Sequence, residues 1–502
     1  MATARLTASE IDAATPAERN RYADALRLVA ILIVVYGHWL LAVITVQDGQ
    51  LEAVNLLTVA DWTHWLTWIF QVMPLFFFVG GYANAAAYRS ARAKGVSWAD
   101  WVRGRARRLL RPVLPVVVLW IPVGGMLALL GVDGDLLQFA TQVAIVPVWF
   151  LAAYLVVCAA VPLTYEAHER SRWGTLLGFV LLAVVIDRLH LVGVPAIGWS
   201  NFLWIWGAIH QVGYLWHDQD RLTGSAGAPP DAGRGDVGAA GRGDVGAAGA
   251  QAGSPGDVPV LLPRTAGGAL LLTAAGYGTL LLLTMVGDYP VSMVGVDGAT
   301  RSNNSPPSTA LLAFGAGQIG IALALRGPAT RVLSRPKVWG TVVMTGSLTM
   351  TVYLWHMTAM IAVAAALIPT GIWPPRETVD AAWWWTRPLW WLACTVALVL
   401  IVPMFGRFER AGSPRSRPSA IRAGAGAILA TAGLGLLVFG GLHLPGTATG
   451  VPWIPLGMLA LGLGWLGVLR KPTKPDHVPP PGGAAEPDEA APMDDSGELA
   501  GR

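Results

Sequence analysis

The stretch RYADALRLVAILIVVYGHW at residues 21–39 decides the fold class of this chain. About 20 mainly apolar residues are enough to cross a lipid bilayer. The 20 residues before the stretch are polar and contain no early small-residue cleavage site, so we expect it to remain in the protein rather than act as a removable signal. The sequence therefore predicts a first transmembrane helix at 25–46.

The composition of the whole chain is typical of a membrane protein. Of its 502 residues, 54% are hydrophobic and 13% are charged, whereas an ordinary soluble domain is about 25% charged. We predict an all-α, polytopic bundle of about 12 transmembrane helices, a ten-helix core followed by two C-terminal helices. After the first helix, spans are expected at 66–88, 110–130, 138–163, 173–187, 199–217, 265–287, 309–325, 339–369, 388–406, 423–442 and 452–469.

Shifts in composition divide the chain into segments. One stretch is rich in Gly, Ala and Pro and contains GRGDVGAA at 233–240 and again at 241–248, so it cannot form a core and should be disordered. The expected order is a cytoplasmic tail at 1–20, helices one to six with an Arg-rich loop at 21–217, the disordered linker at 218–262, helices seven to ten at 263–410, two extra helices at 411–470 and a disordered tail at 471–502.

Lys and Arg are distributed unevenly between the loops. If the N-terminus is cytoplasmic, all but four of the 35 Lys and Arg residues fall on the cytoplasmic side; the four are Arg188, Arg301, Arg376 and Arg387. Such an excess is the positive-inside signal. We therefore expect a multi-pass protein of the plasma membrane with both termini in the cytoplasm, and the net charge of +4 does not indicate a nucleic-acid partner.

Two ionisable residues share one face of the first helix. Arg27 and His38 are eleven residues apart, which is about 20° from three full turns. The helical rise places His38 ~16 Å deeper than Arg27, near the middle of the membrane, and Asp24 is within ion-pair reach of Arg27. An ionisable group at this depth indicates function, although a neutral His hydrogen-bonded between helices is the alternative. A neutral imidazole could accept a proton from a hydroxyl group.

The segment RYADALRLVAILIVVYGH, with Arg27, ten residues and then His38, resembles the first helix of the acyltransferase 3 family. Members of that family are membrane proteins that move acyl groups from acyl-CoA to sugars, lipids or antibiotics. The resemblance extends over residues 20–410 and implies catalytic roles for His38, as a general base, and for Arg27, which would hold the donor or stabilise negative charge on the thioester oxygen. The chain resembles members without a fused hydrolase-like domain.

The loop 89–111 contains two overlapping Arg-x-x-Arg pairs, formed by Arg105, Arg108 and Arg111. Residues three apart are neighbours on a helix, and guanidinium groups suit phosphate because of their rigid donor fork. A positive-inside signal that contacts anionic lipid headgroups is the alternative. Because an Arg-x-x-Arg motif in this loop belongs to the family pattern, the resemblance implies that these residues bind the phosphates of CoA.

Four further residues are candidates for contacts with substrate. Gly-Gly-Tyr at 80–82 stands where the family usually has Ser-Gly-Phe or Ser-Gly-Tyr, so a Ser hydroxyl is missing beside Tyr82, and the glycines permit close helix packing. Trp149 begins a Trp-Phe-Leu sequence similar to the family's fourth helix, but interfacial Trp is common. Tyr353 and His356 resemble the family's Tyr-Leu-x-His element, and His356 could line a pore or serve packing alone.

Other chemistries find no support in the sequence. Cys158 and Cys394 lie in apolar stretches and form neither a disulfide framework nor a metal motif. His64, His210 and His217 lie at predicted span ends, where a solvated imidazole needs no function. No HExxH, GxSxG or nucleotide-binding fingerprint occurs in a suitable context. We expect no metal and no permanently bound cofactor.

The combined prediction is an integral membrane acyltransferase. It would move an acyl group, with acetyl expected first, from cytoplasmic acyl-CoA to a hydroxyl of a carbohydrate, lipid or small molecule. One alternative is a secondary transporter with two six-helix halves joined by the linker, although the halves show no evident internal similarity. Another is a membrane scaffold or receptor, which has no need for an ionisable His in mid-membrane.

Overall fold

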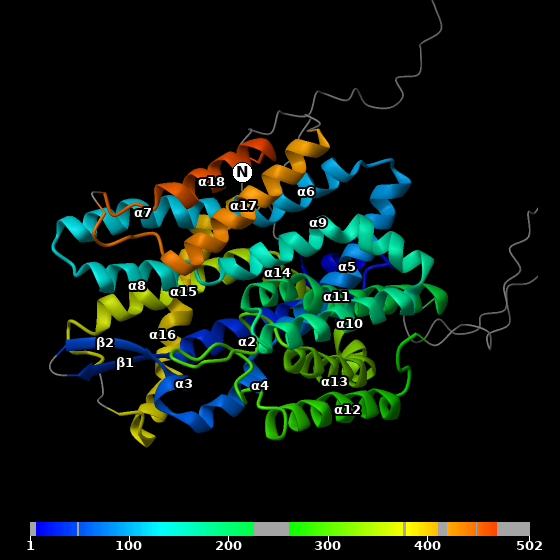
Figure 1. Ribbon diagram of the computed structural model, residues 1–502, viewed down its shortest axis with the longest axis horizontal. Helices are drawn as coiled ribbons and strands as arrows, with labels where there is room; N and C mark the ends of the chain where they lie inside the picture. The colour runs from blue at the N-terminus through cyan, green and yellow to red at the C-terminus, as the bar shows by residue number, and fades with distance from the viewer. Residues whose placement is uncertain are drawn as a thin grey trace, which may run out of the picture.

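The computed structural model is a bundle of α-helices with one small β-hairpin, which confirms the predicted fold class (Figure 1). Apolar side chains from nearly all the long helices form one continuous core. The structure describes residues 7–47, 50–224, 261–374, 378–409, 419–447 and 449–468.

Helices and short 3-10 helices follow one another along the described residues, with a single pair of strands among them. In chain order the elements are α1 (Ala8–Ala13), α2 (Arg21–Leu41), β1 (Ala42–Gln47), β2 (Gln50–Asn55), α3 (Leu56–Val59), η1 (Asp61–Leu66), α4 (Thr67–Phe70), α5 (Met73–Ala93), α6 (Trp98–Leu110), η2 (Arg111–Val113), α7 (Leu114–Leu129), α8 (Gly134–Ile145), α9 (Val148–Arg170), α10 (Arg172–Leu191), η3 (Pro195–Ser200), α11 (Asn201–Leu222), α12 (Ala266–Met285), α13 (Thr309–Leu333), α14 (Pro336–Gly346), α15 (Thr349–Leu367), α16 (Ala381–Phe405), η4 (Gly406–Glu409), α17 (Ala420–Gly440) and α18 (Trp453–Trp465).

Ten helical stretches among the described residues are long and apolar enough to cross a membrane. Two of the predicted spans fall outside that set: α11, which carries several polar side chains, and α18, which has 13 residues. The predicted span at 138–163 is divided between α8 and α9, and the one at 339–369 between α14 and α15. The sequence therefore located the apolar segments well and their breaks less well.

The first helix begins and ends earlier than the predicted span at 25–46, and it leads into the hairpin. The side chain of Asn20 caps α2 by accepting a hydrogen bond from a first-turn N–H group at 3.0 Å. The helix ends at Leu41, and the chain continues as an antiparallel pair of strands in which Ala42 is opposite Asn55. The run at 43–46 consists entirely of β-branched residues, which favour strands. The all-α prediction did not include this hairpin.

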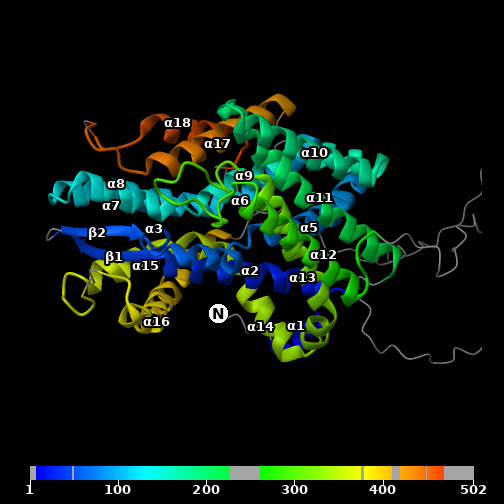
Figure 2. The ribbon, with the colours of Figure 1, turned by 60° about the horizontal axis from the view of Figure 1, so that its bottom comes forward.

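Helices α5 and α11 pack closely at the centre of the bundle (Figures 1 and 2). A side chain at Gly81 would collide with the carbonyl oxygen of His210, and one at Gly213 would collide with the carbonyl oxygen of Phe78. The two backbones therefore lie in direct contact, as small residues allow in membrane helices. Nearly every residue of α11 beyond Trp204 is buried, so protein surrounds this polar helix.

The predicted N-terminal tail contains an ordered element. Helix α1 packs against α14, and both lie side by side in Figure 2. The indole of Trp339 donates a hydrogen bond to Thr15 at 2.7 Å, and the guanidinium groups of Arg19 and Arg21 lie over its ring. Cation–π contacts of this kind fix the entry of the chain into α2.

The two C-terminal helices pack against one another, and α17 also packs across α6, α8 and α9 (Figure 1). Their contact with α8 is polar, because Thr141 accepts hydrogen bonds from the backbone N–H groups of Leu442 and His443, both at 3.1 Å. Gln142 donates to the carbonyl oxygen of Phe439 at 3.0 Å. Helices α17 and α18 therefore hold α8 in place.

The predicted disordered segments lie largely outside the described residues. The first part of the predicted linker is helical, because α11 continues to Leu222. Its last residues, Leu261 and Leu262, are buried, and their N–H groups donate to the side-chain oxygen of Gln219 at 3.0 and 2.7 Å. Residues 225 to 260 are not described. The predicted tail at 471–502 is outside the described residues as well.

Candidate functional site

The two histidines singled out in the sequence are in direct contact. His38 on α2 and His356 on α15 are joined by a hydrogen bond of 2.8 Å between Nδ1 of His38 and Nε2 of His356. Nδ1 of His356 lies 2.6 Å from the carbonyl oxygen of Tyr353. The indole of Trp39 donates a hydrogen bond to the carbonyl oxygen of His356 at 2.9 Å, which ties the two helices together beside the pair.

These contacts determine the tautomers of the neutral pair. A carbonyl oxygen can only accept, so Nδ1 of His356 carries a proton and donates it to Tyr353. Nε2 of a neutral His356 is then an acceptor, and His38 donates to it from Nδ1. Nε2 of His38 consequently carries a lone pair, which no hydrogen bond among the described residues uses. The hydrogen-bond chain thus leaves a basic nitrogen on His38, as the partner of a catalytic histidine commonly does.

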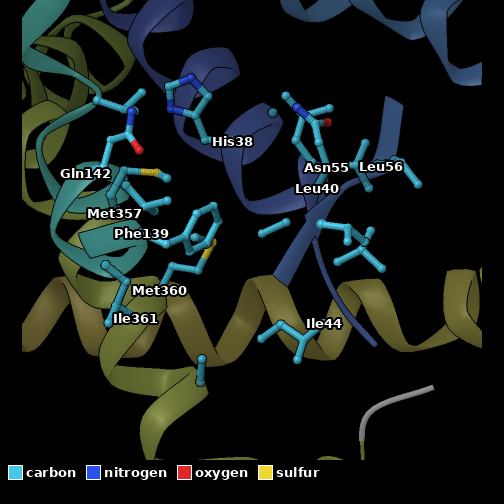
Figure 3. A pocket seen from close by; sticks show the side chains of 18 of the residues that line it. His38, Leu40, Ile44, Asn55, Leu56, Phe139, Gln142, Met357, Met360 and Ile361 are labelled. Carbon is cyan, nitrogen blue, oxygen red and sulfur yellow. The ribbon is translucent and has the colours of Figure 1, made fainter. Parts of the chain in front are cut away.

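His38 lines a cavity of about 820 Å³. The walls come from α2, the hairpin, α8 and α15, and Figure 3 shows Phe139, Met357 and Met360 among the side chains near His38. Of the predicted substrate contacts, Trp149 and Tyr353 also line this cavity. The hydroxyl of Tyr353 donates a hydrogen bond to the carbonyl oxygen of Pro147 at 2.8 Å, so its proton is already used within the protein.

Two predicted substrate contacts do not line the cavity. His356 is fully buried behind His38 and is absent from the lining. Tyr82 lies elsewhere, where its ring packs against Trp216 and His217. The geometry therefore makes His356 a partner of His38, and it leaves Tyr82 in the contact between α5 and α11.

Three of the predicted arginines lie near one another at the end of the bundle where α2 begins, which we call the Arg-rich end. Arg27 forms the expected ion pair with Asp24 at 3.0 Å. The charges of Arg27 and Arg105 both act on Arg108, and the guanidinium of Arg105 lies over the ring of Trp101. Several positive charges within electrostatic range of one another attract an anion to the space between them.

The third predicted arginine, Arg111, is the first residue of η2 and follows α6 directly. The charge of Arg111 acts on Arg107, together with that of Arg103. Arg107 is 2% exposed, and none of its side-chain nitrogens has a hydrogen-bond partner among the described residues. Helix α17 packs along α6, and a side chain at Gly467 would reach Arg103. Arg111 is therefore within electrostatic range of Arg107, and Arg105 and Arg27 are within electrostatic range of Arg108.

Sequence reasoning missed a buried polar cluster between the Arg-rich end and the core. The amide nitrogen of Asn84 lies 3.0 Å from Nε2 of His210 and 3.2 Å from the hydroxyl of Tyr154. The charge of Arg105 acts on both Tyr154 and His210. His210 is buried rather than solvated, and so is His217. The signal that could have revealed this cluster is the unusual number of polar residues within the span at 199–217.

A second group of polar side chains joins α9, α10 and α11. Asp218 accepts hydrogen bonds from Nε2 of His168 at 3.1 Å and from Arg172 at 2.9 Å. Gln211 lies 2.6 Å from Nδ1 of His168. These short hydrogen bonds connect the three helices. Among the described residues, no group of three or more His, Cys, Asp or Glu is arranged to hold a metal ion.

A polytopic bundle in which a histidine backed by a second histidine lines an apolar cavity defines a membrane protein suited to acid–base chemistry. A family model described as an acyltransferase domain, acyltransferase 3, matches residues 20–407. The chain therefore belongs to the acyltransferase 3 family, and it is a membrane acyltransferase. No curated protein and no solved structure matches the chain.

The extent of the family match bears on two predictions. It ends before α17, so the two C-terminal helices lie outside the matched domain, as expected. It also runs across the predicted linker and includes helices from both sides of it. One domain over this range argues against a transporter built from two separate halves.

Proposed function

We propose that the protein transfers an acyl group from acyl-CoA to a hydroxyl group, with His38 as the general base. The observation that carries the proposal is the hydrogen-bond chain from Tyr353 through His356 to His38. It leaves Nε2 of His38 unprotonated at the wall of a cavity. A general base needs both a free lone pair and access to the proton that it removes.

The proposed step uses one proton and forms one bond for each bond broken. The acceptor hydroxyl oxygen attacks the thioester carbonyl carbon while Nε2 of His38 takes the hydroxyl proton. The tetrahedral intermediate then expels the sulfur of CoA, and the protonated His38 returns the proton to that sulfur. The products are an ester and free CoA thiol. His356 is a positioning residue, because its Nε2 accepts from His38 and stabilises the imidazolium that forms.

The arginines at the Arg-rich end suit the phosphates of the donor. Arg105 and Arg108 lie within electrostatic range of each other and of Arg27, and guanidinium groups bind phosphate strongly. Arg27 is ~16 Å from His38 along α2, so we assign it to the donor rather than to the thioester oxygen. Arg111 remains a third candidate for these phosphates, and its charge acts on the neighbouring Arg107.

The location of the donor determines the proposed orientation of the protein in the membrane. Acyl-CoA is made in the cytoplasm and its phosphates keep it there, so we propose that the Arg-rich end faces the cytoplasm of a bacterial cell. The plasma membrane is then the natural location. The acceptor would be a hydroxyl-bearing carbohydrate, lipid or small molecule of the cell envelope.

Transfer can be tested with membrane vesicles whose Arg-rich end faces outward. Acyl-CoA labelled in the acyl group is added to vesicles that contain the wild type or His38→Ala, at matched protein levels. We expect thiol-free labelled product from the wild type and none above background from the variant. Equal labelling in the two preparations would exclude His38 as the base, and no labelling with any acyl donor would remove the proposed activity.

A further inference from the structure

The cavity beside His38 is long. Six residues of α15 line it along one side of the helix, from Tyr353 to Ala365, and Ile368 continues the row just after the helix ends. His356 marks the level of the histidine pair on this helix. From there to Ile368 the helical rise gives ~18 Å, so the cavity continues well past the reacting groups. An acetyl group would occupy only its first part.

The walls of the cavity are apolar. Apart from Asp297, no Asp, Glu, Lys or Arg lines it among the described residues. Several polar groups in the wall already have protein partners. Gln142 donates to Phe439, and Gln71 donates to the carbonyl oxygen of Met293 at 3.3 Å. A sugar with many hydroxyl groups would find few partners here, and each buried unpaired hydroxyl costs free energy.

We infer that this cavity holds the acyl chain of the donor, so that the protein uses medium- or long-chain acyl-CoA. The inference rests on the proposed function, because it identifies the donor at the same site. If CoA binds at the Arg-rich end, its thioester reaches His38 from that side. A chain that continues in the same direction passes into the cavity, where Met357 and Met360 offer flexible apolar contacts.

The direction of the cavity distinguishes this occupant from the tail of a lipid acceptor. An amphiphile from the membrane holds its polar head at the surface and its chain in the interior. To present a hydroxyl to His38 it would have to place its polar head among apolar side chains such as Phe139 and Met357. The acyl chain of a donor meets no such cost, because its polar end already lies toward the Arg-rich end.

Chain-length preference tests the inference. Ala364 lines the cavity beyond the histidine pair, whereas Ala362 lies two residues away, is exposed and does not line it. Donors from acetyl- to palmitoyl-CoA are compared in the wild type, in Ala364→Phe and in the control Ala362→Phe. Because each buried methylene adds to binding, we expect the wild type to prefer long donors by roughly tenfold or more. Ala364→Phe should lose that preference and keep transfer from short donors, while Ala362→Phe resembles the wild type.

Each outcome has a distinct meaning. Transfer from acetyl-CoA with no gain for longer chains, or unchanged preference in Ala364→Phe, would overturn the inference and leave the proposed function standing. No transfer from any donor would remove the proposed function itself. A palmitoyl-CoA analogue with a photoreactive group at the chain end gives a second readout. It should label peptides of α8 and α15, and labelling confined to other helices would contradict the assignment.

Discussion

At the residue scale, the ability of His38 to accept a proton at Nε2 depends on how His356 fixes its tautomer. If its role is to accept the proton of Nδ1, a side chain with an acceptor at this place should rescue part of the activity. We expect His356→Ala to lower kcat by about 10²-fold, with donor affinity nearly unchanged because His356 does not line the cavity. His356→Gln, whose amide oxygen can accept, should recover a measurable part of kcat. Equal kcat in the two variants would indicate a packing role only.

The neighbouring residues Arg107 and Arg108 offer a matched pair for the donor site. Arg108 lies near Arg27 and Arg105, whereas Arg107 is buried on another face without a partner among the described residues. We expect Arg108→Ala to weaken acyl-CoA binding by roughly 10- to 100-fold, the value of a charged hydrogen bond. Arg107→Met should leave donor binding intact and preserve or raise Tm, since it removes an uncompensated buried charge. Equal loss of acyl-CoA affinity in both variants would contradict the assignment of the donor phosphates to Arg108 and not to Arg107.

A contact between two histidines far apart in the chain cannot be predicted from a single sequence. Arg27 and His38 could be paired from helical periodicity alone, because they lie on one helix. The bond between His38 and His356 joins positions 318 residues apart, and no local pattern contains that information. The burial of Arg107 was missed for a similar reason, since it depends on which helices pack beside α6.

At the element scale, the contact between α5 and α11 sets the shape of the core. A methyl group at Gly81 would meet the backbone of α11, so we expect Gly81→Ala to destabilise the protein by about 1–3 kcal/mol. Gly178 on α10 has open space around it, and Gly178→Ala should be neutral or stabilising by up to about 1 kcal/mol, because alanine is the better helix former. Thermal unfolding in detergent compares the two. A lower Tm in both, or in neither, would contradict the close packing.

The elements that sequence reasoning located best are those whose signal is local. Apolar runs of membrane length predicted α2, α9, α10, α12, α13 and α16. The hairpin after Leu41 was missed because a β-branched run can also continue a membrane helix. Helix α11 was found, but its polar residues were taken to lie at a wet end, because the burial of His210 depends on the neighbouring helices.

At the scale of the whole molecule, the proposed orientation can be tested with single cysteines. Both native cysteines are buried, so they should give little background. Lys94 lies in the loop between α5 and α6, and Ala299 lies in the exposed loop before α13. In intact cells we expect an impermeant thiol reagent to label Ala299→Cys and not Lys94→Cys, with the reverse in inside-out vesicles. The opposite pattern would reverse the orientation and exclude cytoplasmic binding of the donor at the Arg-rich end.

The most direct test of the account separates donor binding from acyl transfer in His38→Gln. Purified wild type and variant, in the same lipid, are given labelled acyl-CoA, and both bound donor and single-turnover product are measured. We predict that the variant binds acyl-CoA as the wild type does, while its transfer rate falls by at least about 10²-fold for want of a general base. Transfer at the wild-type rate in His38→Gln would contradict the central claim that Nε2 of His38 removes the acceptor proton.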